Sequence, residues 1–129
     1  MIVVDTSVWV EAFRRGTSPA AAHLRELLDA DLVALVAPVR IEILSGANRT
    51  NRARLQRLLA ALPVLDLAEG AWSRIERWLL DAAESGDRFG VADLLVASIA
   101  TDHGAEIWSL DGDFRRMAGL GFVTLHRPS

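Results

Sequence analysis

The side chains with the clearest capacity for chemistry in this sequence are acidic residues that end, begin or interrupt apolar segments. They are Asp5, Glu42, Asp93, Asp111 and Asp113. If the fold brings them together, the carboxylates repel one another, by about 4 kcal/mol for a pair ~4 Å apart at an effective dielectric constant of about 20. Protonation of some of these groups, or a cation among them, must then relieve the repulsion.

The composition restricts which cation such a cluster would hold. The sequence contains no cysteine, and its three histidines are scattered along the chain without ligand spacing. Carboxylate oxygens without thiolate or clustered imidazole favour Mg²⁺ or Mn²⁺. A site of this kind activates water and stabilises the charged transition state of a phosphodiester reaction.

Each acid also has a simpler structural explanation. Asp5 and Asp111 lie two residues before the predicted starts of helices, a region where Asp is a favoured N-cap residue. Asp93 and Asp113 fall in or beside predicted first helical turns, where the helix dipole favours negative charge. Glu42 does not lie at a predicted helix start, so the simpler structural explanation for this residue is a buried ion pair with an arginine. Several helix-terminal acids along one edge of a sheet would repel one another, and this favours a common site.

The elements that must position these acids alternate between strands and helices. Apolar runs predict strands at 2–4, 32–36, 63–67, 106–110 and 121–125. Helical spacing, N-cap residues, Pro and Gly predict helices at 7–15, 18–30, 38–47, 51–62, 69–84, 91–103 and 113–117. The alternation predicts one α/β domain over residues 1–129, with a central parallel sheet flanked by helices. Strand ends and helix starts share one edge of such a sheet, so the acids can converge there.

Charge and hydropathy limit the class of protein. The net charge of −3 argues against binding to nucleic acid through bulk positive charge. All basic residues are arginine, and the face carrying Arg49–Arg57 can contact RNA phosphates, bind an acidic protein segment or face solvent. No apolar run is long enough to span a bilayer and no signal-peptide pattern is present, so we expect a cytoplasmic protein without a membrane partner.

The acids occur in an order that resembles the PIN-domain family. Asp5-Thr6-Ser7 follows the first predicted strand, Glu42 lies in "RIEILSG", Asp93 lies in "VADLLVASIA", and the last two acids lie in "WSLDGDF". More narrowly, essentially the whole chain resembles the VapC toxins of bacterial toxin–antitoxin systems. The resemblance implies a three-layer PIN-like fold. It also implies a Mg²⁺-dependent endoribonuclease that acts as the toxin of a type II system.

The same resemblance implies roles for individual residues. The implied catalytic residues are Asp5, Glu42, Asp93 and Asp111. Metal ligands are expected at Asp5, Asp93 and Asp111, with Mn²⁺ able to replace Mg²⁺, whereas Glu42 either binds a second metal or orients the attacking water. Supporting roles are expected for Thr6, Ser7, Ser109 and Asp113, and the resemblance leaves open which of the two hydroxyls beside Asp5, Thr6 or Ser7, faces the site. The family often has Thr at the position of Ser109.

The resemblance also implies partners. These are an RNA substrate, a cognate VapB-type antitoxin that blocks the site, and a second copy of the chain in a homodimer. Two other functions compete with this interpretation. One is a catalytically silent PIN-like module that binds RNA or protein. The other is a phosphatase with Asp5 as its nucleophile; such enzymes commonly carry a second Asp two residues later, where this chain has Ser7.

Overall fold

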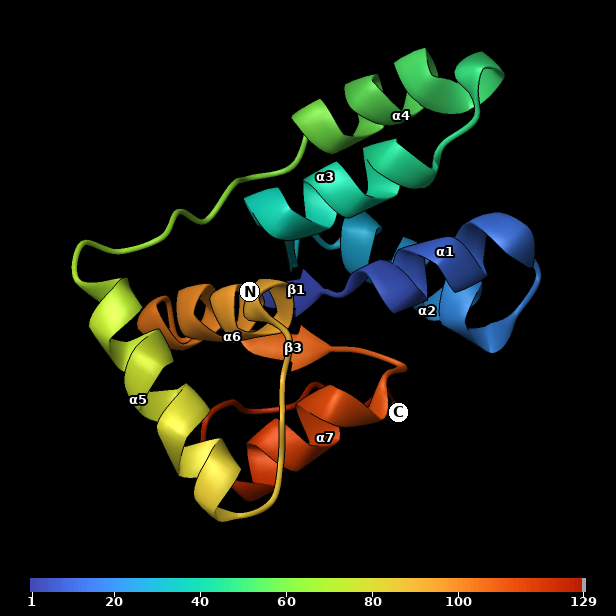
Figure 1. Cartoon of the computed structure of the whole chain (residues 1–129). Helices are drawn as coiled ribbons and strands as arrows, with labels where there is room; N and C mark the ends of the chain where they lie inside the picture. The colour runs from blue at the N-terminus through green and yellow to red at the C-terminus, as the bar shows by residue number, and fades with distance from the viewer. Residues whose placement is uncertain (129) are drawn as a thin grey trace.

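Three parallel strands lie at the centre of the computed structural model, which describes residues 1–128 (Figure 1). They are β1 (Ile2–Val4), β2 (Val33–Ala34) and β3 (Glu106–Trp108), in the order β2-β1-β3. Val3 pairs with Ala34 on one side and with Ile107 on the other. All three residues of β1 are buried, and since consecutive strand residues point to opposite faces, both faces of the sheet are covered. The predicted α/β class and parallel sheet are therefore confirmed.

Helices surround this sheet in the described part of the chain. They are α1 (Thr6–Arg14), α2 (Pro19–Asp29), α3 (Ala37–Gly46), α4 (Arg49–Ala60), α5 (Ala71–Glu84), α6 (Val91–Asp102) and α7 (Gly112–Gly119). In Figure 1, α3 and α4 form a pair on one side of α6, while α5 and α7 lie on the other. Half of the residues of α6 are buried, and this helix contacts α3, α5 and β3. No helix among residues 1–128 is long and apolar enough to cross a membrane.

Local signals account for most helix boundaries. The side chain of Ser18 accepts a hydrogen bond from the Ala21 N–H at 3.1 Å, and Pro19 occupies the first turn, as predicted for α2. Gly104 follows α6 with a φ of +64°, which suits a residue just beyond a helix C-terminus. The predicted start of α4 at residue 51 was two residues late, because Asn48 caps this helix through the Asn51 N–H.

The predicted strands at 63–67 and 121–125 are wrong in extent, because each segment forms only one isolated bridge with the sheet. Val64 pairs with Leu35, and Leu125 pairs with Ile107, both in parallel orientation. Val64 is 47% exposed, so its side chain makes few of the contacts that would stabilise a longer strand at this edge of the sheet. These segments continue the sheet order at its two edges without becoming strands.

Two of the scattered histidines meet in the fold and tie the last segment to α2. The Nε2 atoms of His23 and His126 lie 2.9 Å apart, within hydrogen-bonding distance. Their Nδ1 atoms lie 3.4 Å and 3.3 Å from the carboxylates of Glu26 and Glu106, respectively. This cluster holds the segment after Leu125 against the rest of the molecule.

Candidate metal centre

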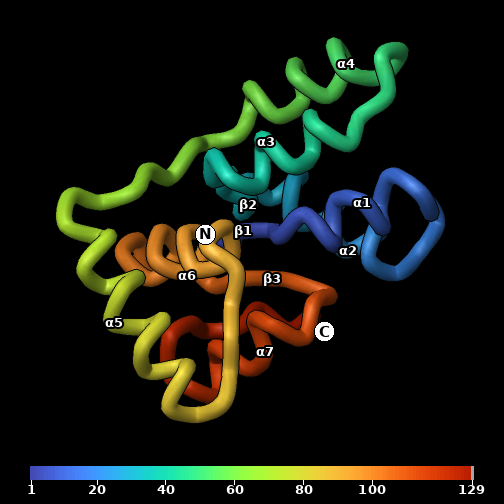
Figure 2. Tube along the Cα trace, viewed as in Figure 1, coloured from blue at the N-terminus to red at the C-terminus, as the bar shows by residue number. Residues whose placement is uncertain are grey.

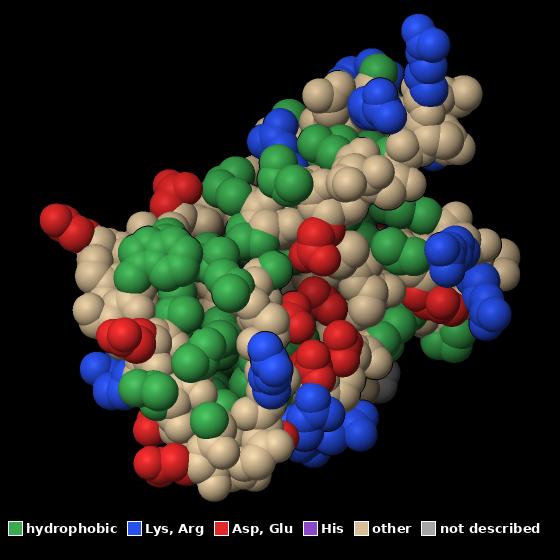
Figure 3. All heavy atoms as spheres, in the orientation of Figure 1, with side chains coloured by type: hydrophobic (Ala, Val, Ile, Leu, Met, Phe, Trp, Pro, Cys, Tyr) green, Lys and Arg blue, Asp and Glu red, His purple; other side chains and the backbone are tan. Residues whose placement is uncertain are grey.

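Three of the predicted acids form a compact carboxylate cluster. One oxygen from each of Asp93, Asp111 and Asp113 lies within 4.8 Å of the others. Asp5 and Glu42 lie near enough for their charges to act on Asp93. Figure 3 shows acidic side chains gathered in the middle of one face of the molecule. The structure therefore brings all five predicted acids into one region.

The strand ends and helix starts place these acids, as the chain order predicts. Asp5 follows β1 and caps α1, and its carboxylate lies 3.4 Å from the Ser7 N–H donor. Asp111 follows β3 and caps α7 by accepting a hydrogen bond from the Asp113 N–H at 3.0 Å. Asp93 lies in the first turn of α6. Helix capping and membership of the cluster are thus compatible roles.

Two serine hydroxyls orient the buried carboxylate of Asp5. Its Oδ2 accepts hydrogen bonds of 2.8 Å from the hydroxyls of both Ser7 and Ser109. Both serines also accept from the chain after β3, because Ser7 Oγ bonds the Leu110 N–H and Ser109 Oγ bonds the Asp111 N–H. The hydrogen bonds to the Asp5 carboxylate from residues 1–128 all use Oδ2. Its Oδ1 is therefore free of protein donors and available to a cation.

Glu42 is joined to this region through Thr6. The hydroxyl of Thr6 donates to Glu42 Oε1 at 3.2 Å. Glu42 is exposed and forms no ion pair with any described residue, so the alternative of a buried ion pair is wrong. Both hydroxyls that follow Asp5 thus contact acids of the site, Thr6 at Glu42 and Ser7 at Asp5 itself.

The electrostatics of Asp93 show that the cluster holds more negative charge than the protein neutralises. Burial, as the largest cause, and the charges of the surrounding carboxylates together raise the pKa of Asp93 from 3.8 to about 6. Those carboxylates are Asp5, Asp111, Asp113 and Glu42. Three adjacent carboxylates and no softer ligand form a donor set that fits a hard divalent cation such as Mg²⁺ or Mn²⁺.

Sequence reasoning missed two charged residues beside the cluster. Arg116 on α7 pairs with Asp113 and, through Nε at 3.3 Å, with Asp87 in the connection between α5 and α6. The spacing of Asp113 and Arg116 is an i, i+3 helical pair, which was a usable signal. The contact with Asp87 joins separate segments, and no local pattern indicates it.

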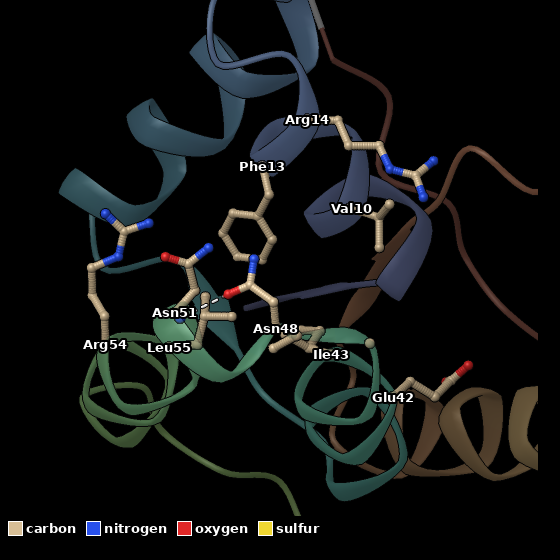
Figure 4. A pocket seen from close by; sticks show the side chains of 11 residues that line it. Val10, Phe13, Arg14, Glu42, Ile43, Asn48, Asn51, Arg54 and Leu55 are labelled. Atoms are coloured by element: carbon tan, nitrogen blue, oxygen red, sulfur yellow. Dashed lines mark hydrogen bonds between the residues drawn. The ribbon is translucent and has the colours of Figure 1, made fainter.

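A groove between α1, α3 and α4 lies beside the acidic cluster (Figure 4). It encloses about 360 Å³ and reaches Glu42 at one border. Its apolar lining includes Phe13, Ile43 and Leu55, and Arg54 adds a positive charge. The groove and the acids therefore share one side of the protein.

Comparison with known proteins shows similarity along nearly the whole chain. The sequence matches the family model of the PIN domain over residues 2–120. It is 40% identical over 125 residues to the VapC ribonuclease Mb1587 of Mycobacterium bovis, covering 93% of both chains. It is 31% identical over 135 residues to ribonuclease VapC5 of Mycobacterium tuberculosis, covering 97% of this chain and 93% of that one.

Solved structures support the same fold. The structure of VapBC2 from Rickettsia felis, bound to a DNA fragment from its promoter, superimposes with a TM-score of 0.78 at 21% identity over 98% of both chains. The sarcin–ricin loop cleaving toxin VapC20 of Mycobacterium tuberculosis superimposes with a TM-score of 0.68 at 20% identity, over 99% of this chain and 100% of that one. At these identities the likeness concerns the arrangement of strands and helices.

Proposed function

Since this chain belongs to the PIN-domain family and groups with its VapC members, we propose that it is a Mg²⁺-dependent endoribonuclease and the toxin of a type II toxin–antitoxin system. The observation that carries this proposal is the convergence of Asp93, Asp111 and Asp113 within 4.8 Å. Asp5 and Glu42 border the same cluster and raise the pKa of Asp93. This arrangement supports phosphodiester hydrolysis.

The carboxylates would divide the work of holding the cation. Asp93 and Asp111 would bind it together with Asp5, whose free Oδ1 is kept in place because Ser7 and Ser109 hold Oδ2. Asp113 would join them from the first turn of α7. When bound, the ion supplies positive charge for the phosphodiester transition state and lowers the pKa of water.

Glu42 would act from the open side of the site. Its exposure and its hydrogen bond from Thr6 suit a carboxylate that orients the attacking water or holds a second ion. The number of Mn²⁺ ions bound per molecule of Glu42→Gln distinguishes these two roles. If Glu42 holds a second ion, the variant should bind one ion fewer than the wild type.

The decisive experiment is cleavage of a structured RNA by the purified protein. We expect cleavage in Mg²⁺, none in EDTA, and recovery when Mg²⁺ or Mn²⁺ is added back. Asp93→Asn should abolish cleavage while the circular dichroism spectrum stays unchanged. Binding of RNA without cleavage in any metal, by the wild-type protein, would support the catalytically silent module instead. A phosphorylated Asp5 would support the phosphatase.

We assign the groove of Figure 4 to a segment of a VapB-type antitoxin. The groove has an apolar floor at Ile43 and Leu55 and ends at Glu42, so a segment lying in it would reach the site and block it. Phe13 lines this groove and is 46% exposed. Phe13→Arg should prevent inhibition by the cognate VapB-type antitoxin and leave RNA cleavage intact. Leu32→Arg, at a similarly exposed position outside the groove, is the matched control.

We assign homodimer formation to an exposed apolar face on α5 and the start of α6. Trp72 and Leu79 lie two turns apart on the same side of α5, and Leu79 and Val91 line a common cavity. Trp72 is 58% exposed and Val91 is 57% exposed. A contiguous group of exposed apolar side chains is typical of a surface that binds another protein. Figure 3 shows hydrophobic side chains gathered on this side, beside the acids. Light scattering should detect a dimer in the wild type and a monomer in Trp72→Glu, with Leu32→Glu unchanged.

A further inference from the structure

Arg116 makes three contacts beside the acidic cluster, and two of them reach a separate segment of the chain. Its Nη2 pairs with Asp113 Oδ1, one turn earlier on α7. Its Nε lies 3.3 Å from Asp87 Oδ1, and its guanidinium carbon lies 5.7 Å from the centre of the Phe89 ring. The planar guanidinium can make all three contacts at once, because its donors diverge in one plane while its face is free to lie on a ring.

These contacts connect the two helix starts that carry the cluster. Asp87 and Phe89 belong to the connection that runs past α7 and enters α6, whose first turn holds Asp93 (Figure 2). Asp113 lies in the first turn of α7. Phe89 is buried, so the guanidinium lies on a fixed surface. Arg116 therefore ties the segment before Asp93 to the helix that carries Asp113.

We propose that Arg116 is a positioning residue that sets the separation of Asp93 and Asp113 for cation binding. This inference rests on the proposed metal centre. Arg116 pairs with one oxygen of Asp113 and leaves the other oxygen to the cation. It also keeps the entry to α6 against α7, so the cation meets carboxylates that are already in place. Partners that orient metal ligands in this way commonly change metal affinity by about 10- to 100-fold when they are removed.

A positioning role and a simple charge effect predict opposite results. Arg116 places a positive charge next to the cluster, so its removal should tighten cation binding if charge alone matters. If position matters, removal should weaken binding although the site becomes more negative. Arg116→Lys keeps the charge but lacks the planar fork, so only the positioning role predicts weaker binding for this variant.

The test is calorimetric titration of the metal-free full-length protein with Mn²⁺, without RNA. We expect Arg116→Lys and Arg116→Gln to bind Mn²⁺ about tenfold more weakly than the wild type. Arg115→Lys and Arg115→Gln are the matched controls, since Arg115 is the exposed neighbour and makes no ion pair within the described residues. Both controls should bind as the wild type does. A second readout is the Mg²⁺ concentration for half-maximal RNA cleavage, which should rise in the Arg116 variants with little change in the rate at saturating Mg²⁺.

The outcomes separate this inference from the proposed function. Unchanged or tighter Mn²⁺ binding by Arg116→Lys overturns the positioning role, as does an equal loss in the Arg115 controls. Failure of the wild-type protein to bind Mn²⁺ would instead overturn the metal centre itself. If Arg116→Gln does not fold, Arg116→Lys carries the test alone, because it retains the positive charge at this position.

Discussion

Ser109 donates a hydrogen bond of 2.8 Å to Oδ2 of Asp5, although 104 positions separate the two residues in the chain. Asp5 follows the central strand and Ser109 follows the neighbouring one. The bond therefore connects the two strand ends that carry the acidic site. It holds one oxygen of Asp5 toward the protein and leaves the other free for a cation.

Removing this hydroxyl should loosen Asp5. Ser109→Ala takes one donor from a buried carboxylate and one acceptor from the Asp111 N–H, so we expect a loss of about 1 kcal/mol in the free energy of unfolding. Cleavage of RNA should fall by about tenfold, because Asp5 is then less well oriented. Urea unfolding and cleavage assays measure the two effects. Ser109→Thr keeps the hydroxyl and should retain both properties; equal defects in the Thr and Ala variants would contradict the role of the hydroxyl.

Capping and metal binding at Asp111 can be separated by two substitutions. Asp111→Asn keeps an oxygen that can accept from the Asp113 N–H, whereas Asp111→Ala removes it. We expect only the Ala variant to lose about 1 kcal/mol of stability, since Asn is as good an N-cap residue as Asp. Both variants should lose RNA cleavage. Full activity in Asp111→Asn would show that this residue serves the helix alone.

The raised pKa of Asp93 predicts how pH affects the metal-free protein. Because the pKa in the folded state, about 6, exceeds the ordinary value of 3.8, the folded protein binds this proton more tightly than the unfolded chain does. The resulting stabilisation is complete below about pH 4 and is lost as the pH rises through about 6. We therefore expect Tm of the wild type to fall, relative to Tm of Asp93→Asn, between about pH 4 and pH 7. Solvent screening at this half-buried group reduces the size of the effect.

Mg²⁺ should reverse this trend. The cation competes with the proton for the same carboxylate, so Mg²⁺ affinity should rise with pH across the same range. Saturating Mg²⁺ should then remove the difference between the wild type and Asp93→Asn at neutral pH. A difference in Tm that does not vary with pH would contradict the raised pKa.

The hydrogen bond from Thr6 to Glu42 should matter for activity more than for stability. Glu42 is exposed, so Thr6→Val should change the free energy of unfolding by no more than about 0.5 kcal/mol. Loss of the donor should lower the rate of RNA cleavage by about tenfold, because Glu42 then adopts other orientations. Thr6→Ser is the control that retains the hydroxyl. Cleavage at the wild-type rate by Thr6→Val would show that the Thr6 hydroxyl does not contribute to activity.

Much of the fold could be predicted from local patterns. The alternation of strands and helices, the cap at Ser18 and the glycine after α6 are properties of neighbouring residues, and the structure confirms them. The lengths of the two edge segments could not be predicted, because pairing depends on what covers each side chain. Val64 is apolar and β-branched, but it remains half-exposed and forms a single bridge.

The sequence by itself determined which acids stand at strand ends and helix starts, since caps and apolar periodicity are encoded over a few residues. Tertiary structure alone decided which of them come closest, and it grouped Asp113 with Asp93 and Asp111. It also brought Arg116 to Asp87 and His23 to His126, pairs that no periodicity connects. The physical reason is that distances between remote positions follow from how α6, α7 and the sheet pack together. Packing depends on the whole core and on no single segment of it.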